Sequence, residues 1–160
     1  MNESRPDESS RWGGAASANG PLTSRVDYCW RDVSVAYGTF AKKMGVDTSE
    51  LYVVDALRDE PEGLSQRSIC EVCDMGKQTI SAICKRLAAR DVVVAHAGQA
   101  DKRERIMALT DEGREQWRLP VESMRELEMK AAGAIGVEEG ELFIRVIKQY
   151  AKTFQEEVQR

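Results

Sequence analysis

The spacing of apolar residues changes abruptly near residue 91, and this change constrains the fold more than any other feature of the chain. Up to Arg90 apolar side chains recur every three or four residues, which indicates helices. The β-branched run 92–95 and the alternating run 106–109 then predict two strands joined by a polar turn at 98–102. Helices that lead directly into a small hairpin indicate a mainly α fold with a minor β element.

The two helices before this hairpin are predicted to be close together. Leu64-Ser65 begins a short helix that ends near Cys73, with Ser65 as its N-cap. Asp74-Met75-Gly76 makes a tight turn, and a longer helix follows from Lys77 to Arg90. A short helix, a tight turn, a longer helix and a hairpin form the pattern of a winged helix-turn-helix, which binds duplex DNA.

Long apolar helices flank this unit on both sides. A narrow apolar stripe predicts a first helix over 24–44. Asp47 and Glu50 have capping-box spacing at the start of a second helix. Thr110 caps a long fifth helix, and a sixth follows it. The predicted order is α-α-α-α-β-β-α-α, and the flanking helices carry more apolar surface than so small a unit can cover.

Composition excludes several classes of function. No stretch approaches the ~18–20 apolar residues of a membrane span, and the N-terminus lacks the apolar core of a secretion signal, so we expect a cytoplasmic protein with no membrane partner. The chain has no nucleophile elbow and no phosphate-binding glycine loop, so we expect neither enzymatic activity nor a cofactor. Cys70 and Cys73 form a CxxC, but two thiols and the single histidine, His96, fall short of a metal site.

Charge is distributed unevenly along an acidic chain. The net charge is −4, yet the segment 77–105 holds seven basic and three acidic side chains, a balance of +4 that leaves −8 for the rest. Binding to DNA depends on a local field rather than on the total. A basic face on an acidic body is therefore expected.

The second helix of a helix-turn-helix enters the major groove with its N-terminal residues nearest the bases. Asp101, on the hairpin turn, is expected to orient an arginine that enters the minor groove. The predicted DNA contacts are Lys77, Gln78, Thr79, Ser81, Lys85 and Arg86 on the helix and Lys102 and Arg103 on the turn.

These residues resemble the MarR family of winged-helix transcription regulators. The resemblance rests on Leu64-Ser65, on 76–81, on Lys85-Arg86-Leu87 and above all on Asp101-Lys102-Arg103 followed by Leu109-Thr110-Asp111-Glu112-Gly113. The chain departs from the common pattern at Ala82, which replaces a residue that is often basic. It also departs at three cysteines: Cys70, Cys73 and Cys84.

The resemblance implies an obligate homodimer in which the first, fifth and sixth helices interlock with those of the partner. It implies a near-palindromic operator, Arg103 as the wing arginine, and a repressor released by a small phenolic or lipophilic ligand or by cysteine oxidation. The chain would then comprise a disordered tail (1–21), a helical dimerisation region (22–46 and 111–160) and a winged helix-turn-helix DNA-binding lobe (47–110), the last two interlocked in one domain.

Two further groups of residues are candidates for regulation. Trp30, Tyr37, Tyr52 and Trp117 are candidates for an effector pocket, although packing in the core or at an interface is the more common role of such residues. Cys29 is a candidate redox residue, which would require exposure and a lowered pKa. An alternative hypothesis is a winged-helix protein-interaction module without DNA binding, which the acidic total and Ala82 favour; another is a redox-sensing regulator.

Overall fold

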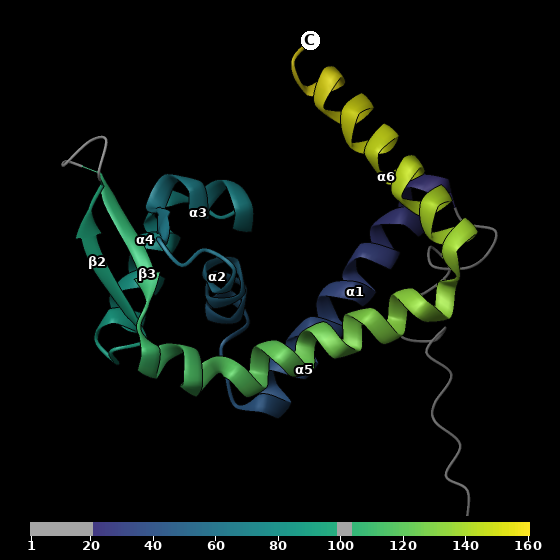
Figure 1. The fold of residues 1–160 in the computed structure, drawn as a ribbon. Coiled ribbons are helices and arrows are strands. Elements are labelled where there is room, and N and C mark those ends of the chain that lie inside the picture. Colours follow the sequence, from purple (N-terminus) through teal and green to yellow (C-terminus); the bar gives the residue numbers. More distant parts are fainter. Residues whose placement is uncertain (1–20, 99–103) are drawn as a thin grey trace, which may run out of the picture.

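The computed structural model describes residues 21–98 and 104–160. Figure 1 shows a lobe of short helices and a small sheet joined to an arm of three long helices. The elements in chain order are α1 (Leu22–Met44), α2 (Thr48–Arg58), β1 (Leu64–Ser65), α3 (Gln66–Cys73), α4 (Lys77–Ala88), β2 (Val93–Ala97), β3 (Arg105–Leu109), α5 (Asp111–Ile135) and α6 (Val137–Val158).

The predicted fold class, mainly α with a small wing and flanking helices, is confirmed. In Figure 1, α5 begins beneath the sheet, runs along the base of the molecule beside α1, and leads into α6, which rises from the far end of α5. No helix within the described ranges is both long enough and apolar enough to cross a bilayer.

The core lies in the lobe. The buried side chains come from α2, α3, α4, the strands and the first half of α5, with Ala41 as the contribution from α1. Beyond Met124, α5 contributes no buried side chain, and α6 contributes none. The apolar residues of α5 and α6 are therefore of two kinds. Those near Trp117 fill the core, and those beyond Leu127 face outward.

Side-chain caps fix three helix starts as predicted. Asp47 accepts a hydrogen bond from the backbone N–H of Glu50 at 3.0 Å, Ser65 accepts one from Ser68 at 3.0 Å, and Thr110 accepts one from Gly113 at 2.8 Å. The capping box at the start of α2 is only half formed. The carboxylate of Glu50 turns away from the helix end and binds Arg86 of α4 and Arg90 of the turn after α4 instead.

The sheet has three strands rather than the predicted two. β1 pairs with β3 through Leu64↔Met107 and Ser65↔Ile106, and the strand order is β1-β3-β2. Gly63 makes this pairing possible, because its φ is +79° and a Cβ there would lie 2.3 Å from the carbonyl oxygen of Met107. β2 and β3 pair from Val93↔Leu109 to Ala97↔Arg105, which is the predicted hairpin.

Candidate nucleic-acid interface

A tight turn holds α3 and α4 together. Asp74 adopts the left-handed conformation (φ 49°, ψ 46°) at the end of α3, where aspartate is one of the residues that tolerates it. The N–H of Met75 then bonds the carbonyl of Cys70 at 3.1 Å. Ile69 and Ile80, fully buried, lie on the two helices and join them to the core.

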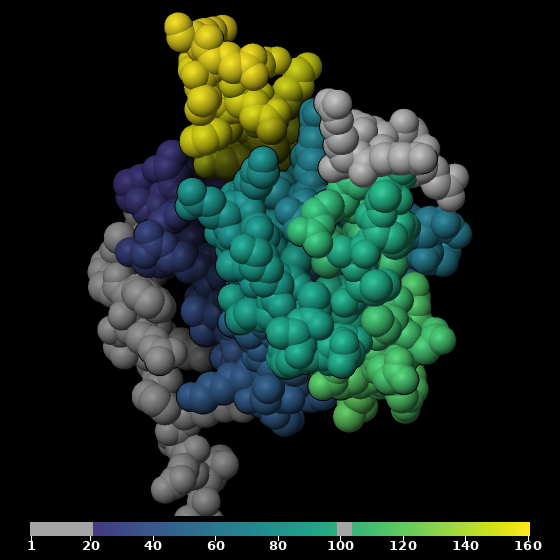
Figure 2. Space-filling view, turned by 90° about the vertical axis from the view of Figure 1, so that its left-hand side faces the viewer, coloured from purple at the N-terminus to yellow at the C-terminus, as the bar shows by residue number. Residues whose placement is uncertain are grey.

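The two faces of α4 have opposite character. Its buried face consists of Ile80, Ile83, Cys84 and Leu87. The outer face carries Lys77, Gln78, Thr79, Ala82 and Lys85 as exposed residues, with Ser81 half-buried at its edge. In Figure 2, which views the molecule from the side of the lobe, the chain segment that includes α4 (teal) forms part of the front surface. Polar and basic groups are thus presented to solvent on a helix whose other face is fixed.

Arg86 differs from the other residues predicted to bind DNA. Its Nε donates to Glu50 Oε1 at 2.9 Å, and a terminal nitrogen lies 3.9 Å from Asp47 Oδ1. Arg90, one turn later, donates to Glu50 Oε2 at 2.5 Å. The guanidinium of Arg86 is therefore bound to a carboxylate of its own chain, although the side chain stays half exposed.

The wing is described up to its tip. Gly98 N–H bonds the carbonyl of Glu104 at 2.9 Å, which closes the hairpin beyond the last strand pair. Arg105 is exposed on β3, and His96 is exposed on β2. The predicted wing residues Asp101, Lys102 and Arg103 lie outside the described residues.

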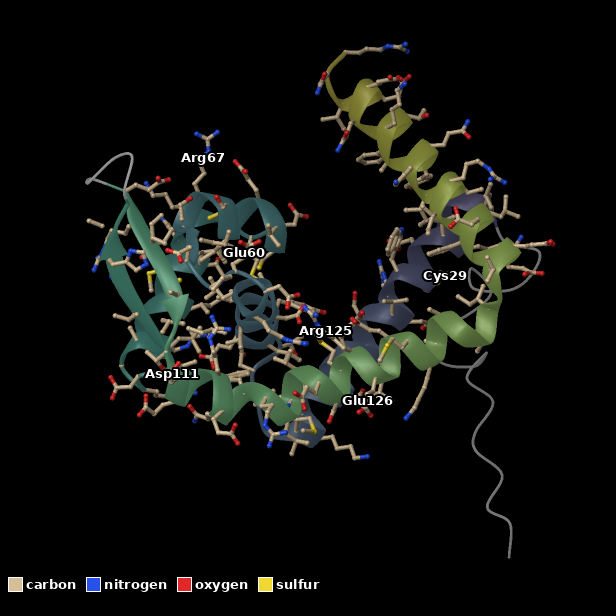
Figure 3. The ribbon with its side chains drawn as sticks, in the orientation of Figure 1. Cys29, Glu60, Arg67, Asp111, Arg125 and Glu126 are labelled. Atoms are coloured by element: carbon tan, nitrogen blue, oxygen red, sulfur yellow. The ribbon has the colours of Figure 1, made fainter. Side chains whose placement is uncertain are left out.

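Arg67 is a candidate contact that the sequence prediction missed. Its side chain is largely exposed and binds Glu71 at 3.0 Å, and Figure 3 shows it projecting outward from α3. A basic residue two positions after the N-cap of the first helix in a helix-turn-helix was the available signal, because that end of the helix approaches the DNA backbone.

Two of the four aromatic residues proposed for an effector pocket lie together. The Tyr37 and Tyr52 rings meet edge to face with centroids 5.7 Å apart, and the Tyr37 hydroxyl donates to Glu128 Oε1 at 2.6 Å. Burial raises the pKa of both phenols, and the hydrogen bond to Glu128 raises that of Tyr37 further. This cluster joins α1, α2 and α5, where the lobe meets the arm.

Charged residues surround a recess beside this cluster. Arg125 binds Asp55 and Asp59, both at 2.8 Å, and these hydrogen bonds lower the pKa of the Asp59 carboxyl. Figure 3 shows Arg125 on the side of α5 that faces α2. The recess, of about 670 Å³, is lined by Asp55, Arg58, Glu122, Arg125, Glu126, Glu128 and Met129.

The two tryptophans of the proposed pocket lie apart from the tyrosine pair. Trp30 is 46% exposed on α1, whereas Trp117 is 4% exposed in the core. Trp117 borders two other recesses, at the start of α5 and at the corner between α1 and α2. The structure thus brings Tyr37 and Tyr52 together and separates them from Trp117.

The cysteines differ in exposure. Cys29 is exposed on α1, Cys70 and Cys73 are partly buried, and Cys84 is buried. Burial raises the pKa of Cys84 to about 11 and also raises that of Cys73. The thiolate forms that oxidants and metals require are therefore disfavoured at these two sites. Within the described residues, no group of three or more histidine, cysteine or acidic side chains is placed to hold a metal ion.

Many large apolar side chains are exposed on the arm. Such an exposed surface is unusual in a chain that remains monomeric. The series is Leu22, Trp30, Val33 and Val35 on α1, Leu127, Met129 and Ile135 on α5, and Val137, Leu142, Phe143, Ile144, Val146, Tyr150, Phe154 and Val158 on α6.

Comparison with known proteins shows which family the chain is similar to. The transcriptional regulator HosA of Escherichia coli O157:H7 is 28% identical over 101 residues, which are 63% of this chain and 74% of HosA. Residues 44–104 match the model of the MarR family. The chain is thus similar to MarR-family regulators. The resemblance inferred from the sequence is therefore confirmed.

Solved structures share the fold over most of the chain. PcaV of Streptomyces coelicolor, solved with its natural ligand, is 23% identical with a TM-score of 0.67, over 85% of this chain and 98% of PcaV. MepR of S. aureus, solved in complex with DNA, is 16% identical with a TM-score of 0.68, over 79% of this chain and 96% of MepR. The chain thus has the fold of MarR-family transcriptional regulators, including the long helices of the arm.

Proposed function

We propose that this chain is a homodimeric transcriptional repressor that binds a near-palindromic duplex, with one α4 in each of two major grooves. The observation that carries the proposal is the outer face of α4, where Lys77, Gln78, Thr79 and Lys85 are exposed on a helix fixed by its buried side. A helix presented in this way fits the major groove, and its side chains can bond base edges and phosphates. The solved MepR complex with DNA supports the same role for a chain of this fold.

The exposed face of the arm supports the homodimer. α6 is 22 residues long and has no buried residue, yet its Phe143, Ile144, Val146 and Phe154 are exposed and apolar. A second copy of the chain is the partner we propose for this face, because a two-fold pair would also place two copies of α4 on one side of a duplex. The half-sites would then lie about 34–36 Å apart, one turn of DNA.

An effector that changes DNA affinity is the third part of the proposal. The tyrosine pair Tyr37–Tyr52 lies where α1 and α5 of the arm meet α2 of the lobe. A small aromatic or lipophilic molecule that separates the pair would alter the contact between arm and lobe. PcaV was solved with a natural ligand, which shows that a protein of this fold holds a small molecule.

Fluorescence anisotropy tests DNA binding. The protein is titrated against the duplex upstream of its own gene and against a scrambled duplex, at low and moderate salt. We expect selective binding whose affinity falls steeply with salt, with a slope of about 0.9 per phosphate contact. Lys77→Glu/Lys85→Glu should abolish it, whereas Lys42→Glu/Lys43→Glu, the same charge change at the end of α1, should not. Equal loss in both variants would contradict a role for the α4 surface.

Sedimentation velocity tests the homodimer. Phe143→Asp/Phe154→Asp places two carboxylates on the exposed apolar face of α6 and should yield monomer at concentrations where the wild type is a dimer. Val72→Asp, at an equally exposed apolar position on α3, is the matched control and should remain dimeric. A dimer that survives both changes on α6 would refute the proposed interface.

A further inference from the structure

Glu50 is the one charged residue buried in the described part of the chain. It is 4% exposed, and its two carboxylate oxygens are each bound to a different arginine, Arg86 of α4 at 2.9 Å and Arg90 of the turn after α4 at 2.5 Å. A buried carboxylate without such partners would be strongly destabilising. We call these three residues, on α2, on α4 and on the turn that follows α4, the Glu50 clamp.

The clamp lies on the flank of α4 rather than on its outer face. Arg86 lies in the last turn of α4 and Arg90 lies in the turn that follows the helix, and both side chains reach Glu50. Residues 78, 82 and 85 lie on another side, opposite the buried Ile80, Ile83 and Leu87. The clamp also lies at the C-terminal end of α4, away from Lys77, which begins the helix.

The clamp connects α4 to the junction between arm and lobe. Glu50 lies in the first turn of α2, directly after the corner that follows α1. Arg90 and Glu50 line a recess together with Met44 at the end of α1 and Trp117 and Pro120 of α5. The Arg90 Nε also donates to the carbonyl of Arg86 at 3.3 Å, which closes the last turn of α4.

We propose that Glu50 is a positioning residue that sets the selectivity of DNA binding. By holding two arginines, it fixes the rotation of α4 about its axis, on which every base contact of the outer face depends. It also neutralises cations that would otherwise bind phosphates irrespective of sequence. This inference rests on the proposed function, and both effects favour the specific site over other DNA.

Glu50→Gln tests the inference because it removes the charge and keeps the size of the side chain. The probe is a duplex that the wild-type protein selects from a random-sequence pool, compared with a scrambled duplex of the same composition. We expect affinity for the selected duplex to fall about tenfold, as when a single base contact is lost. Affinity for the scrambled duplex should rise, with a salt slope steeper by about 0.9 for each arginine that turns to a phosphate.

Two further variants separate positioning from a general effect of charge or stability. Glu126→Gln makes the same charge change at an exposed residue of α5 and should leave both affinities unchanged. In Glu50→Gln/Arg86→Gln/Arg90→Gln no cation is released, so the salt slope should return to the wild-type value or below while selectivity stays low. The triple variant leaves no buried unpaired charge, so it also serves as the test if Glu50→Gln does not fold.

Hydrogen–deuterium exchange without DNA gives a second measurement. Amides of α4 should exchange faster in Glu50→Gln than in Glu126→Gln, because the clamp no longer holds the end of the helix. A wild-type protein that fails to discriminate between duplexes would overturn the proposed function itself. The role of Glu50 alone would be overturned if the wild type discriminates between the duplexes and Glu50→Gln does so equally well. It would also be overturned if the amides of α4 exchange at the same rate in Glu50→Gln as in Glu126→Gln.

Discussion

Gly113→Ala should destabilise the fold more than the addition of a methyl group at any other position of α5. A Cβ at residue 113 would lie 2.0 Å from the carbonyl oxygen of Val92 and 2.8 Å from its carbon, where ordinary contacts begin at 3.4 Å. Both partners are backbone atoms, so no side-chain rotation relieves the contact. The start of α5 must therefore move away from the strand by about 1.4 Å.

That movement breaks specific bonds. The N–H of Thr110 bonds the carbonyl of Val92 at 3.1 Å, and its hydroxyl bonds that of Asp91 at 2.5 Å. Two such bonds contribute about 1 kcal/mol each, and overpacking costs about 1–3 kcal/mol. After a gain of about 1 kcal/mol from the better helix propensity of alanine, the net loss is roughly 2–4 kcal/mol.

Thermal unfolding at a fixed protomer concentration measures the effect. For a chain of this size a loss of that order lowers Tm by roughly 5–15 °C. Gly133→Ala is the matched control, because it makes the same change in the same helix at a position with nothing within 4 Å of the added Cβ. It should stabilise by about 0.5–1 kcal/mol. A Gly113→Ala protein as stable as the wild type would refute the steric argument.

Three predictions concern titratable groups. Because the pKa of Tyr37 is raised in the folded state, its contribution to the free energy of unfolding is complete below about pH 10 and is lost as pH rises further. In urea unfolding, the free energy of unfolding should therefore decline less steeply with alkaline pH in Tyr37→Phe than in the wild type. An equally steep decline would exclude Tyr37 as its cause. The pKa of Asp59 is lowered by Arg125, so the contribution of Asp59 to the free energy of unfolding is present above about pH 4 and is lost as pH falls further. The pH midpoint of acid unfolding should therefore shift in Asp59→Asn. It should not shift in Glu62→Gln, a substitution at an exposed residue nearby. A disulfide reagent at pH 8 should modify exposed Cys29 rapidly and buried Cys84, whose pKa is about 11, only on unfolding. Rapid modification in a Cys29→Ser/Cys70→Ser/Cys73→Ser protein, which keeps Cys84 alone, would show that α4 opens in the native state.

Local signals accounted for most of the secondary structure. The caps Asp47, Ser65 and Thr110 act within three residues of themselves, so the sequence alone places them. The short strand β1 could not be placed in this way. It forms because Leu64 meets Met107 across the lobe, and a two-residue segment carries no alternation that would indicate a strand.

The candidate site could be predicted from the sequence only where a residue has a single plausible role. The outer face of α4 follows from the 3.6-residue period, and the structure exposes the residues that this period selects. Glu50 and Arg86 each have two plausible partners. Capping-box spacing predicted one partner for Glu50, but its carboxylate binds residues 36 and 40 positions away, and the same bond occupies the Arg86 guanidinium that was predicted to bind phosphate.

The continuity of α5 has a mechanical consequence. This single helix of 25 residues begins in the core of the lobe and ends on the exposed arm, so it acts as a lever about 37 Å long. A tilt of only about 5° at the arm would displace the lobe by about 3 Å. That displacement is close to the rise of one base pair, about 3.4 Å, so a small rotation where two arms meet would be enough to move α4 out of register with its half-site.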